Sequence, residues 1–199
     1  MSVFKEMIKP TLILALVCLV VTGALAVVNG VTGPIIDESE RLAKIEALSQ
    51  VLPGAGSFSE MKTAEELTGE GYSVSERIVG IYEATNGGTP SGYVAQVATK
   101  GYGGDINLFI GVNMQMETTG VVITSHNETP GLGSKAAEPA FKDQFLGAVP
   151  AGLFNVVKNP PSSDSEVEAI SGATISSRAV TNGVDDALEL IKSILEEGK

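Results

Sequence analysis

The sequence predicts an α+β protein in which one N-terminal apolar helix precedes a domain with a mainly antiparallel sheet and flanking helices. Three observations predict this class: a single uncharged apolar segment near the N-terminus, closely spaced β-branched runs separated by turn residues, and amphipathic helical spacing near the C-terminus. Strands that are grouped together in the chain, with helices on either side of the group, are typical of α+β domains rather than of alternating α/β domains.

The composition excludes several classes of protein. The chain has 199 residues, 43% of them hydrophobic, and a formal net charge of -11. This acidity argues against nucleic acid or an anionic lipid surface as the main partner. The single cysteine, Cys18, and the single histidine, His126, exclude an intrachain disulfide, a cysteine-based metal site and a histidine-rich metal site. Any demanding chemistry would therefore come largely from a bound organic cofactor, the alternative being that the protein performs none, and we expect no bound metal.

Residues 11–33 are predicted to form a transmembrane helix after a cytoplasmic tail, residues 1–10. No charged residue lies between Lys9 and Asp37, and the stretch from Thr11 is apolar enough to span a hydrocarbon core of about 30 Å. A cleavable secretory signal is the alternative, since Ala24, Leu25 and Ala26 form a small-x-small cleavage pattern.

Charges on the two sides of the apolar segment predict its orientation. Lys5 and Lys9 precede the segment, whereas acidic residues follow it closely (Asp37, Glu38 and Glu40). Because basic flanks stay on the cytoplasmic side, we expect a single-pass protein of the cell membrane with a cytoplasmic N-terminus and an extracytoplasmic C-terminal domain.

The elements beyond the membrane follow in order. Residues 34–56 are expected to form a stalk helix, residues 40–52, and a linker, because Pro53 and Gly54 end the helical spacing. Residues 57–199 would form the domain. Its β-branched runs at 77–84, 92–99, 105–113 and 120–125 predict an antiparallel meander, followed by a helix at 139–146, a strand pair at 152–158 and 167–170, and a helix at 177–195. The acidic residues of the last helix are expected to form only a solvated surface: Asp185, Asp186, Glu189, Glu196 and Glu197.

The segment from Glu168 to Ser177 is the most informative in the chain. A strand ends near Ile170, a turn of small residues follows, and Ser176 or Ser177 is the expected N-cap of the last helix. Thr174 would then lie just ahead of a helix N-terminus, where unpaired N–H groups favour a phosphate. An ordinary strand-to-helix turn is the alternative interpretation of the same residues.

A glycine-rich loop at residues 128–134, ETPGLGS, has a physical interpretation of its own. Its glycines allow a tight loop with exposed backbone N–H groups, and Thr129 and Leu132 would offer a polar contact and an apolar cover for a flat ring. A plain Pro-Gly turn is the alternative.

The motif SGATISS, preceded by Glu168, resembles the flavinylation motif of FMN-binding domains. The resemblance implies that Thr174 carries FMN as a covalent phosphoester, added by a separate magnesium-dependent flavin transferase that uses FAD. Glu168 departs from the family pattern, which more often has Asp there, but it keeps the charge.

Further stretches extend the resemblance over nearly the whole chain. GYGGDI from Gly101, FIGV from Phe109 and HNETPGLG from His126 are similar in wording and order to the G subunit of the Rnf complex and to the C subunit of the sodium-pumping NADH:quinone oxidoreductase. The total length favours the Rnf family. The resemblance implies an electron-relay flavoprotein that has no complete active site of its own and assembles with other membrane and redox subunits. In that family, electron transfer between ferredoxin and NAD is coupled to sodium or proton translocation.

The resemblance also implies the residues of the flavin site. Beside Thr174, the expected cofactor-binding residues are Ser171, Gly172, Ala173, Ser176, Glu128, Thr129, Leu132 and Gly133. Tyr102 could stack on the ring or pack at a sheet edge, His126 could donate to a flavin oxygen or end a strand near solvent, and Lys135 could offset negative charge or be solvated.

Other functions remain alternatives at this stage. One is the C-type subunit of the quinone reductase or a stand-alone extracytoplasmic FMN carrier, and another is a non-redox anchored scaffold domain. Serine hydrolysis by Ser171 or Ser176 is disfavoured, because only His126 could act as the imidazole base and no oxyanion elbow is evident.

Overall fold

The computed structural model describes residues 2–197, and the chain divides into two compact units, residues 1–45 and 46–199. Helix α1, Ser2–Val51, runs through the first unit and ends in the second. The membrane helix and the stalk helix, which the sequence predicts as separate segments, are therefore one helix. Pro34 lies inside it. A proline removes one backbone hydrogen bond and can bend a long helix without ending it.

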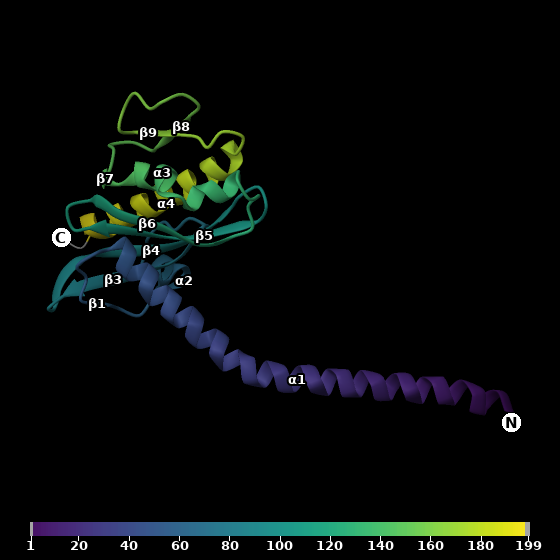
Figure 1. The fold of residues 1–199 in the computed structure, drawn as a ribbon. Helices are drawn as coiled ribbons and strands as arrows, with labels where there is room; N and C mark the ends of the chain where they lie inside the picture. The colour runs from purple at the N-terminus through teal and green to yellow at the C-terminus, as the bar shows by residue number, and fades with distance from the viewer. Residues whose placement is uncertain (1, 198–199) are drawn as a thin grey trace. The chain divides into compact units, whose positions relative to one another are not determined.

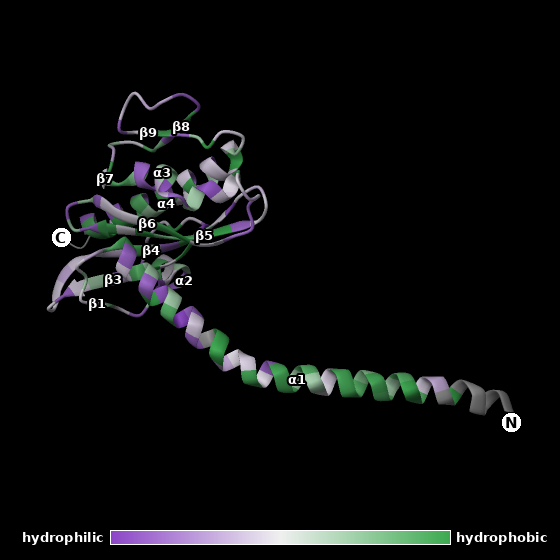
Figure 2. Cartoon of the chain, in the orientation of Figure 1, coloured by the Kyte–Doolittle hydropathy of each residue, from purple (hydrophilic) through white to green (hydrophobic). Residues whose placement is uncertain are grey.

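The apolar part of α1 has the length and composition of a membrane span. Its large apolar side chains between Leu12 and Ile36 are exposed, and Figure 2 shows that this part of the helix is mainly hydrophobic. Such a surface suits a lipid environment, since water would otherwise contact its apolar side chains. This helix fits a single-pass membrane protein.

A seven-stranded antiparallel sheet forms the centre of the second unit (Figure 1). The predicted meander is confirmed, with each strand hydrogen-bonded to the next in the chain. Three short strands extend its edges. The strands are β1 (Ser57–Phe58), β2 (Lys62–Thr63), β3 (Ile78–Asn86), β4 (Thr89–Lys100), β5 (Asp105–Asn113), β6 (Glu117–His126) and β7 (Gly147–Ala148).

One face of the sheet packs against α4, Thr174–Glu197, which lies alongside β4 (Figure 1). The core between them is aliphatic and fully buried, as at Val97, Leu108 and Val184. Burial of one apolar stripe of an amphipathic helix supplies most of the stability of such a contact. This packing holds the N-terminus of α4 against the end of β4.

The opposite face of the sheet receives the last turn of α1. Leu48 and Val51 pack against Tyr82 and Phe109 in a second buried cluster. Gly111 and Gly120 lie under Val51, and a side chain at either glycine would collide with its backbone. The sheet is therefore covered on both faces, which the sequence alone does not reveal.

The remaining elements complete the domain around the sheet. Helix α2 (Ala64–Gly69) starts with a capping box formed by Thr63 and Glu66. The single helix predicted at 139–146 is divided into α3 (Pro139–Lys142) and η2 (Asp143–Phe145), which follow η1 (Gly133–Ala137). Phe141 and Phe145 are both buried in edge-to-face contact. The second strand pair is shorter than predicted and parallel, formed by β8 (Asn155–Val157) and β9 (Glu166–Glu168).

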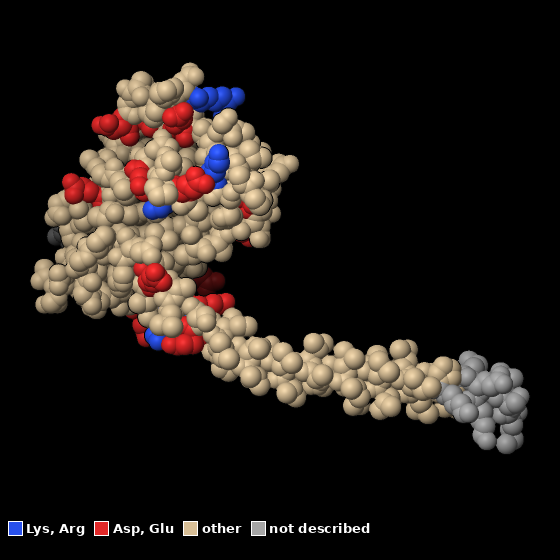
Figure 3. Space-filling view, in the orientation of Figure 1, with Lys and Arg blue, Asp and Glu red and all other residues tan. Residues whose placement is uncertain are grey.

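Acidic side chains are spread over the visible face of the domain (Figure 3), but the prediction that those of α4 are all solvated is wrong. Asp185 is 7% exposed and accepts a hydrogen bond from the Phe154 N–H at 3.0 Å. Asp186 is part-buried and pairs with Arg77 at 2.6 Å. Both carboxylates face segments distant in the chain, so helical periodicity could not identify their surroundings.

Candidate functional site

Three segments that are far apart in the sequence meet at one end of the sheet. They are the turn between β4 and β5, the loop between β6 and η1, and the turn that leads into α4. A cavity of about 470 Å³ lies between them, within the usual size range of ligand pockets. Its lining residues are Tyr102, Glu128, Thr129, Leu132, Gly133, Gly172, Ala173, Thr174, Ile175 and Ser176.

Thr174 is the first residue of α4 and lies in the wall of this cavity. Gly172, at φ +77°, turns the chain from β9 towards the helix, a backbone conformation that a residue with a Cβ adopts only with strain. The Ala173 carbonyl accepts from the Ser177 N–H at 3.0 Å and so starts the helical ladder. The backbone N–H groups of the first turn of a helix have no helical acceptor, which makes this end of the cavity favourable for an anion.

Neither serine is the N-cap that the sequence predicts, because α4 begins three residues earlier than expected. The Ser177 hydroxyl accepts from the Ile170 N–H and donates to the Ala173 carbonyl, both at 3.0 Å, and thereby closes the turn. The Ser176 hydroxyl donates to Glu128. Because its one proton is used there, Ser176 offers no donor to an anion in this arrangement.

Glu128 connects the three segments of the site. One carboxylate oxygen, Oε1, accepts from the Gly103 N–H at 2.8 Å, and the other, Oε2, accepts from Ser176. The residue is only 5% exposed. A Cβ at Gly101 or Gly133 would collide with this carboxylate, so these two glycines permit the close approach of the turn and the loop.

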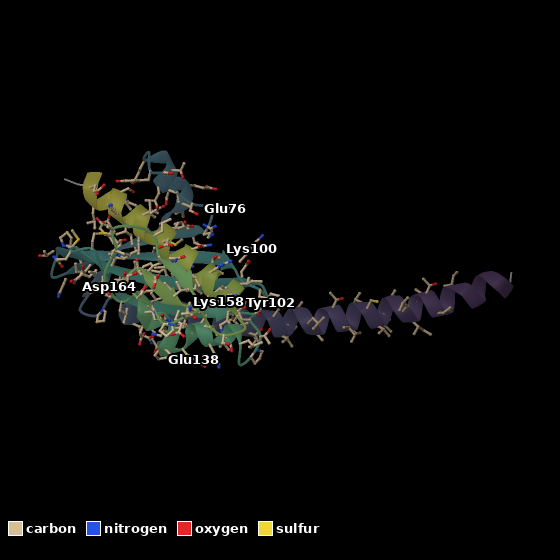
Figure 4. The ribbon with its side chains drawn as sticks, turned by 90° about the horizontal axis from the view of Figure 1, so that it is seen from above. Glu76, Lys100, Tyr102, Glu138, Lys158 and Asp164 are labelled. Atoms are coloured by element: carbon tan, nitrogen blue, oxygen red, sulfur yellow. The ribbon has the colours of Figure 1, made fainter. Side chains whose placement is uncertain are left out.

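Large apolar side chains stand exposed around the mouth of the cavity. Tyr102 is 73% exposed, Ile175 56% and Leu132 43%, and each comes from a different segment. Figure 4 shows Tyr102 at the same edge of the domain as Lys100, with Asp164 on the far side. Such a group of uncovered apolar side chains around a pocket is typical of a binding site.

The structure brings eight of the nine predicted site residues to this cavity. Ser171 is the exception: it is exposed and lines a separate hollow, together with Lys135 and Glu138. Tyr102 lines the cavity as well. Ile175 also lines it, but this residue was not predicted from the sequence. Its signal is an apolar residue between Thr174 and Ser176 at the start of a helix.

His126 and Lys135 lie outside the cavity lining. His126 is the last residue of β6, and its Nδ1 accepts from the Glu128 N–H at 3.3 Å. Lys135 is exposed on the side of Ser171. These positions agree with the alternatives to flavin contact that the sequence left open: His126 ends a strand, and Lys135 is a solvated lysine.

Comparison with known families identifies the class of protein. Residues 101–189 match the model of the FMN-binding domain, a range that includes every residue lining the cavity. Residues 1–51, which correspond to α1, match the model of the RnfG N-terminal region. The fold and the site thus define an FMN-binding domain that follows an N-terminal apolar helix.

Relatives over nearly the full length identify the family. The chain is 34% identical to the G subunit of the Na⁺-translocating ferredoxin:NAD⁺ oxidoreductase complex of Acetobacterium woodii, over 96% of this chain and 94% of the relative. It is 31% identical to the G subunit of the ion-translocating oxidoreductase complex of Methanosarcina acetivorans, over 97% and 98%. The chain belongs to this family of G subunits of ion-translocating ferredoxin:NAD⁺ oxidoreductase complexes, the Rnf complexes.

Two solved structures align with part of this chain. The crystal structure of NqrC from Shewanella oneidensis covers 72% of this chain and 71% of its own, with a TM-score of 0.49 and 19% identity. The C subunit of the Na⁺-translocating NADH-quinone reductase from Parabacteroides distasonis covers 56% of this chain and 62% of its own, with a TM-score of 0.45 and 25% identity.

Proposed function

We propose that this chain is an electron-relay subunit that carries FMN covalently, as a phosphoester on Thr174. The position of Thr174 carries the proposal: its side chain lies in the cavity wall at the start of α4, inside the range that matches the FMN-binding domain. A phosphate attached there would meet the N–H groups of the first helical turn, which stabilise negative charge.

The chemistry of the cavity suits a flavin mononucleotide. The apolar side chains of Tyr102, Leu132 and Ile175 would cover a flat ring, and the loop at 128–134 would hold its polar edge. FMN, when bound, supplies reversible electron transfer from its ring. The protein's own part is to hold the ring at the surface, where a partner can approach it, and to set the charge around it.

Covalent attachment has a physical reason if the domain lies outside the cytoplasm. Even a Kd of about 1 nM, close to -12 kcal/mol, would not retain a cofactor against dilution into a medium that holds no FMN. We propose that Thr174 Oγ forms the new bond to the flavin-side phosphorus of FAD while the anhydride bond breaks and AMP leaves with a flavin transferase. The hydroxyl proton passes to a base of that enzyme.

The membrane arrangement follows from α1 and the charges beside it. Helix α1 would cross the membrane once, with residues 1–10 cytoplasmic and the domain of residues 57–199 extracytoplasmic. Its partners would be the other membrane and redox subunits of an Rnf complex, as the names of the relatives indicate. Ferredoxin oxidation and NAD reduction would take place on those subunits, and this chain would transfer electrons between neighbours.

Intact mass tests the attachment. The full chain, purified from a cell that makes the complex, should weigh about 438 Da more than its polypeptide, the mass of FMN less one water. The Thr174→Val variant should lose this increment and its in-gel fluorescence while keeping its fold, because valine replaces only the hydroxyl. Thr129→Val is the matched control, since it also removes a hydroxyl from the cavity wall and should keep the label.

An unlabelled wild-type chain, with no flavin extracted on denaturation, would contradict the proposal and favour an anchored scaffold domain. Label that persists in Thr174→Val would place the attachment on another residue.

A further inference from the structure

Glu128 provides a buried negative charge in the wall of the proposed flavin cavity. Its two oxygens accept hydrogen bonds from a backbone N–H and from a hydroxyl, Gly103 and Ser176. Both oxygens of a carboxylate can accept from these two donors at once. Both donors are neutral and bring no positive charge.

No basic side chain compensates this charge within the cavity. None of its lining residues in the described part of the chain is Lys, Arg or His. Lys135, seven residues further along the chain, lines the neighbouring hollow instead, and the ion pairs among the described residues do not include Glu128. The tight fit of Gly101 and Gly133 around the carboxylate keeps water away from it.

We propose that the Glu128 carboxylate lowers the reduction potential of the flavin in this cavity. The inference rests on the proposed function and deepens it. Reduction adds electrons to the ring, and a fixed negative charge nearby disfavours any form that gains negative charge. The effect is largest where water is excluded, because charges are screened less in a low-dielectric surrounding.

This assignment separates two roles within the loop at 128–134. Leu132 offers an apolar contact to the ring, whereas Glu128 supplies charge and holds the loop to the turn at Gly103 and to α4. An electron relay with a low reduction potential donates its electrons readily to the next acceptor. A buried carboxylate without a neighbouring cation lowers the potential locally. Charges on the protein surface would contribute less, because salt screens them.

The midpoint potential of the full chain with its flavin, measured by spectroelectrochemistry in detergent, tests the proposal. In Glu128→Gln the potential should rise by at least about 30 mV, a tenfold change in the equilibrium of a two-electron couple. Glu138→Gln is the matched control, since Glu138 is exposed outside the cavity (Figure 4), and its potential should not change. Ser176→Ala removes a donor but keeps the charge, so its potential should not rise.

Several outcomes would overturn the inference. One is a flavin-loaded Glu128→Gln chain with the wild-type potential, and another is an equal rise in Ser176→Ala, which would assign the effect to packing. If Glu128→Gln does not hold flavin, Glu128→Asp decides, because aspartate keeps the negative charge: a loaded variant whose potential stays within about 30 mV of the wild-type value supports the charge, and a larger rise overturns it. Loss of flavin from both variants would give the carboxylate a binding role instead. A wild-type chain that contains no flavin contradicts the proposed function itself.

Discussion

Glu128 and Asp185 are both carboxylates buried in one domain, but they differ in their hydrogen-bond donors and in their charged neighbours. Glu128 has a hydrogen-bond donor at each oxygen and ties three segments together at one end of α4. Asp185, about three turns further along the helix, accepts from the Phe154 N–H and has acidic neighbours, Glu189 and Asp186. Burial raises the pKa of Asp185 from its usual 3.8 to about 6, and the two acidic neighbours add to the rise, while the Phe154 N–H opposes it.

Asp186 sharpens the contrast because it is adjacent to Asp185 in the chain. It accepts from the Ser75 hydroxyl and from Arg77, each at 2.6 Å, and so ties the segment before β3 to α4. Lys192 lines the same hollow as Asp185 without forming an ion pair with it among the described contacts. We expect the partner group, more than the depth of burial, to decide whether a carboxylate stabilises this fold.

The largest effect is expected at the glycine that encloses Glu128. In Gly133→Ala the new methyl group would come within 2.6 Å of Ser176 Oγ and 2.8 Å of Glu128 Cβ, and would collide with Oε2. We expect a loss of about 1–3 kcal/mol in the free energy of unfolding, measured by urea denaturation in detergent. Gly152→Ala is the matched control, because its surroundings are open, and it should change stability by less than about 0.5 kcal/mol. Equal stabilities of the two variants would show that Gly133 does not pack closely against Glu128 and Ser176.

A smaller effect of opposite sign is expected at Asp185. Its folded-state pKa lies above the unfolded value, so the ionised form is penalised in the folded state, and stability falls as the pH rises from 3.8 to about 6 and then levels off. Asp185→Asn removes this penalty and leaves an oxygen to accept from Phe154. We expect a gain of about 1–2 kcal/mol at pH 8, allowing for partial solvent screening of the carboxylate.

Thermal unfolding at a series of pH values checks this prediction. The gain from Asp185→Asn should decrease below pH 6 and vanish only at about pH 3 and below, under both pKa values, where wild-type Asp185 is protonated in the folded and the unfolded state. Glu138→Gln, at an exposed position, should show no such pH dependence. A loss of stability in Asp185→Asn at pH 8 would contradict the prediction, and would mean that the hydrogen bond from the Phe154 N–H to the ionised carboxylate outweighs the cost of burying the charge.

The smallest effect is expected at Asp186, where the same substitution should destabilise. Asp186→Asn removes the negative partner of Arg77 and keeps only an amide oxygen that can accept a hydrogen bond; because the ion pair is partly solvated, we expect a loss of about 1 kcal/mol at pH 7. The loss should shrink in 1 M salt, because added ions screen an ion pair. Two adjacent Asp→Asn changes with opposite signs would confirm that the partner decides, and equal signs would refute it.

Much of the fold could be predicted because its signals are local. The meander of β3 to β6 follows from β-branched runs separated by turn residues, such as Asn86 and Gly87, and the structure confirms it. The start of α4 was misplaced because Ser176 and Ser177 are good caps by composition, while both hydroxyls are used by distant or preceding groups. A short parallel pair such as β8 and β9 has no local signal for its direction.

The candidate site could be predicted in part for the same reason. Two motifs, ETPGLG and SGATISS, contain all eight of the predicted residues that line the cavity, but adjacency within a motif misplaced Ser171, which faces another hollow. The place of Ile175 at the rim depends on how α4 meets the loop, and no motif encodes that.

The amino-acid order by itself determined the apolar helix, the meander and the identity of Thr174 as the residue at the strand-to-helix turn, since each depends on neighbours in the chain. Tertiary structure decided which side chains lose water and which partner each one meets. It placed Gly103 and Ser176 around Glu128, Phe154 beside Asp185 and the end of α1 on Gly111. The physical reason is that desolvation and hydrogen bonding depend on atoms within a few ångströms in space, regardless of how far apart they are in sequence.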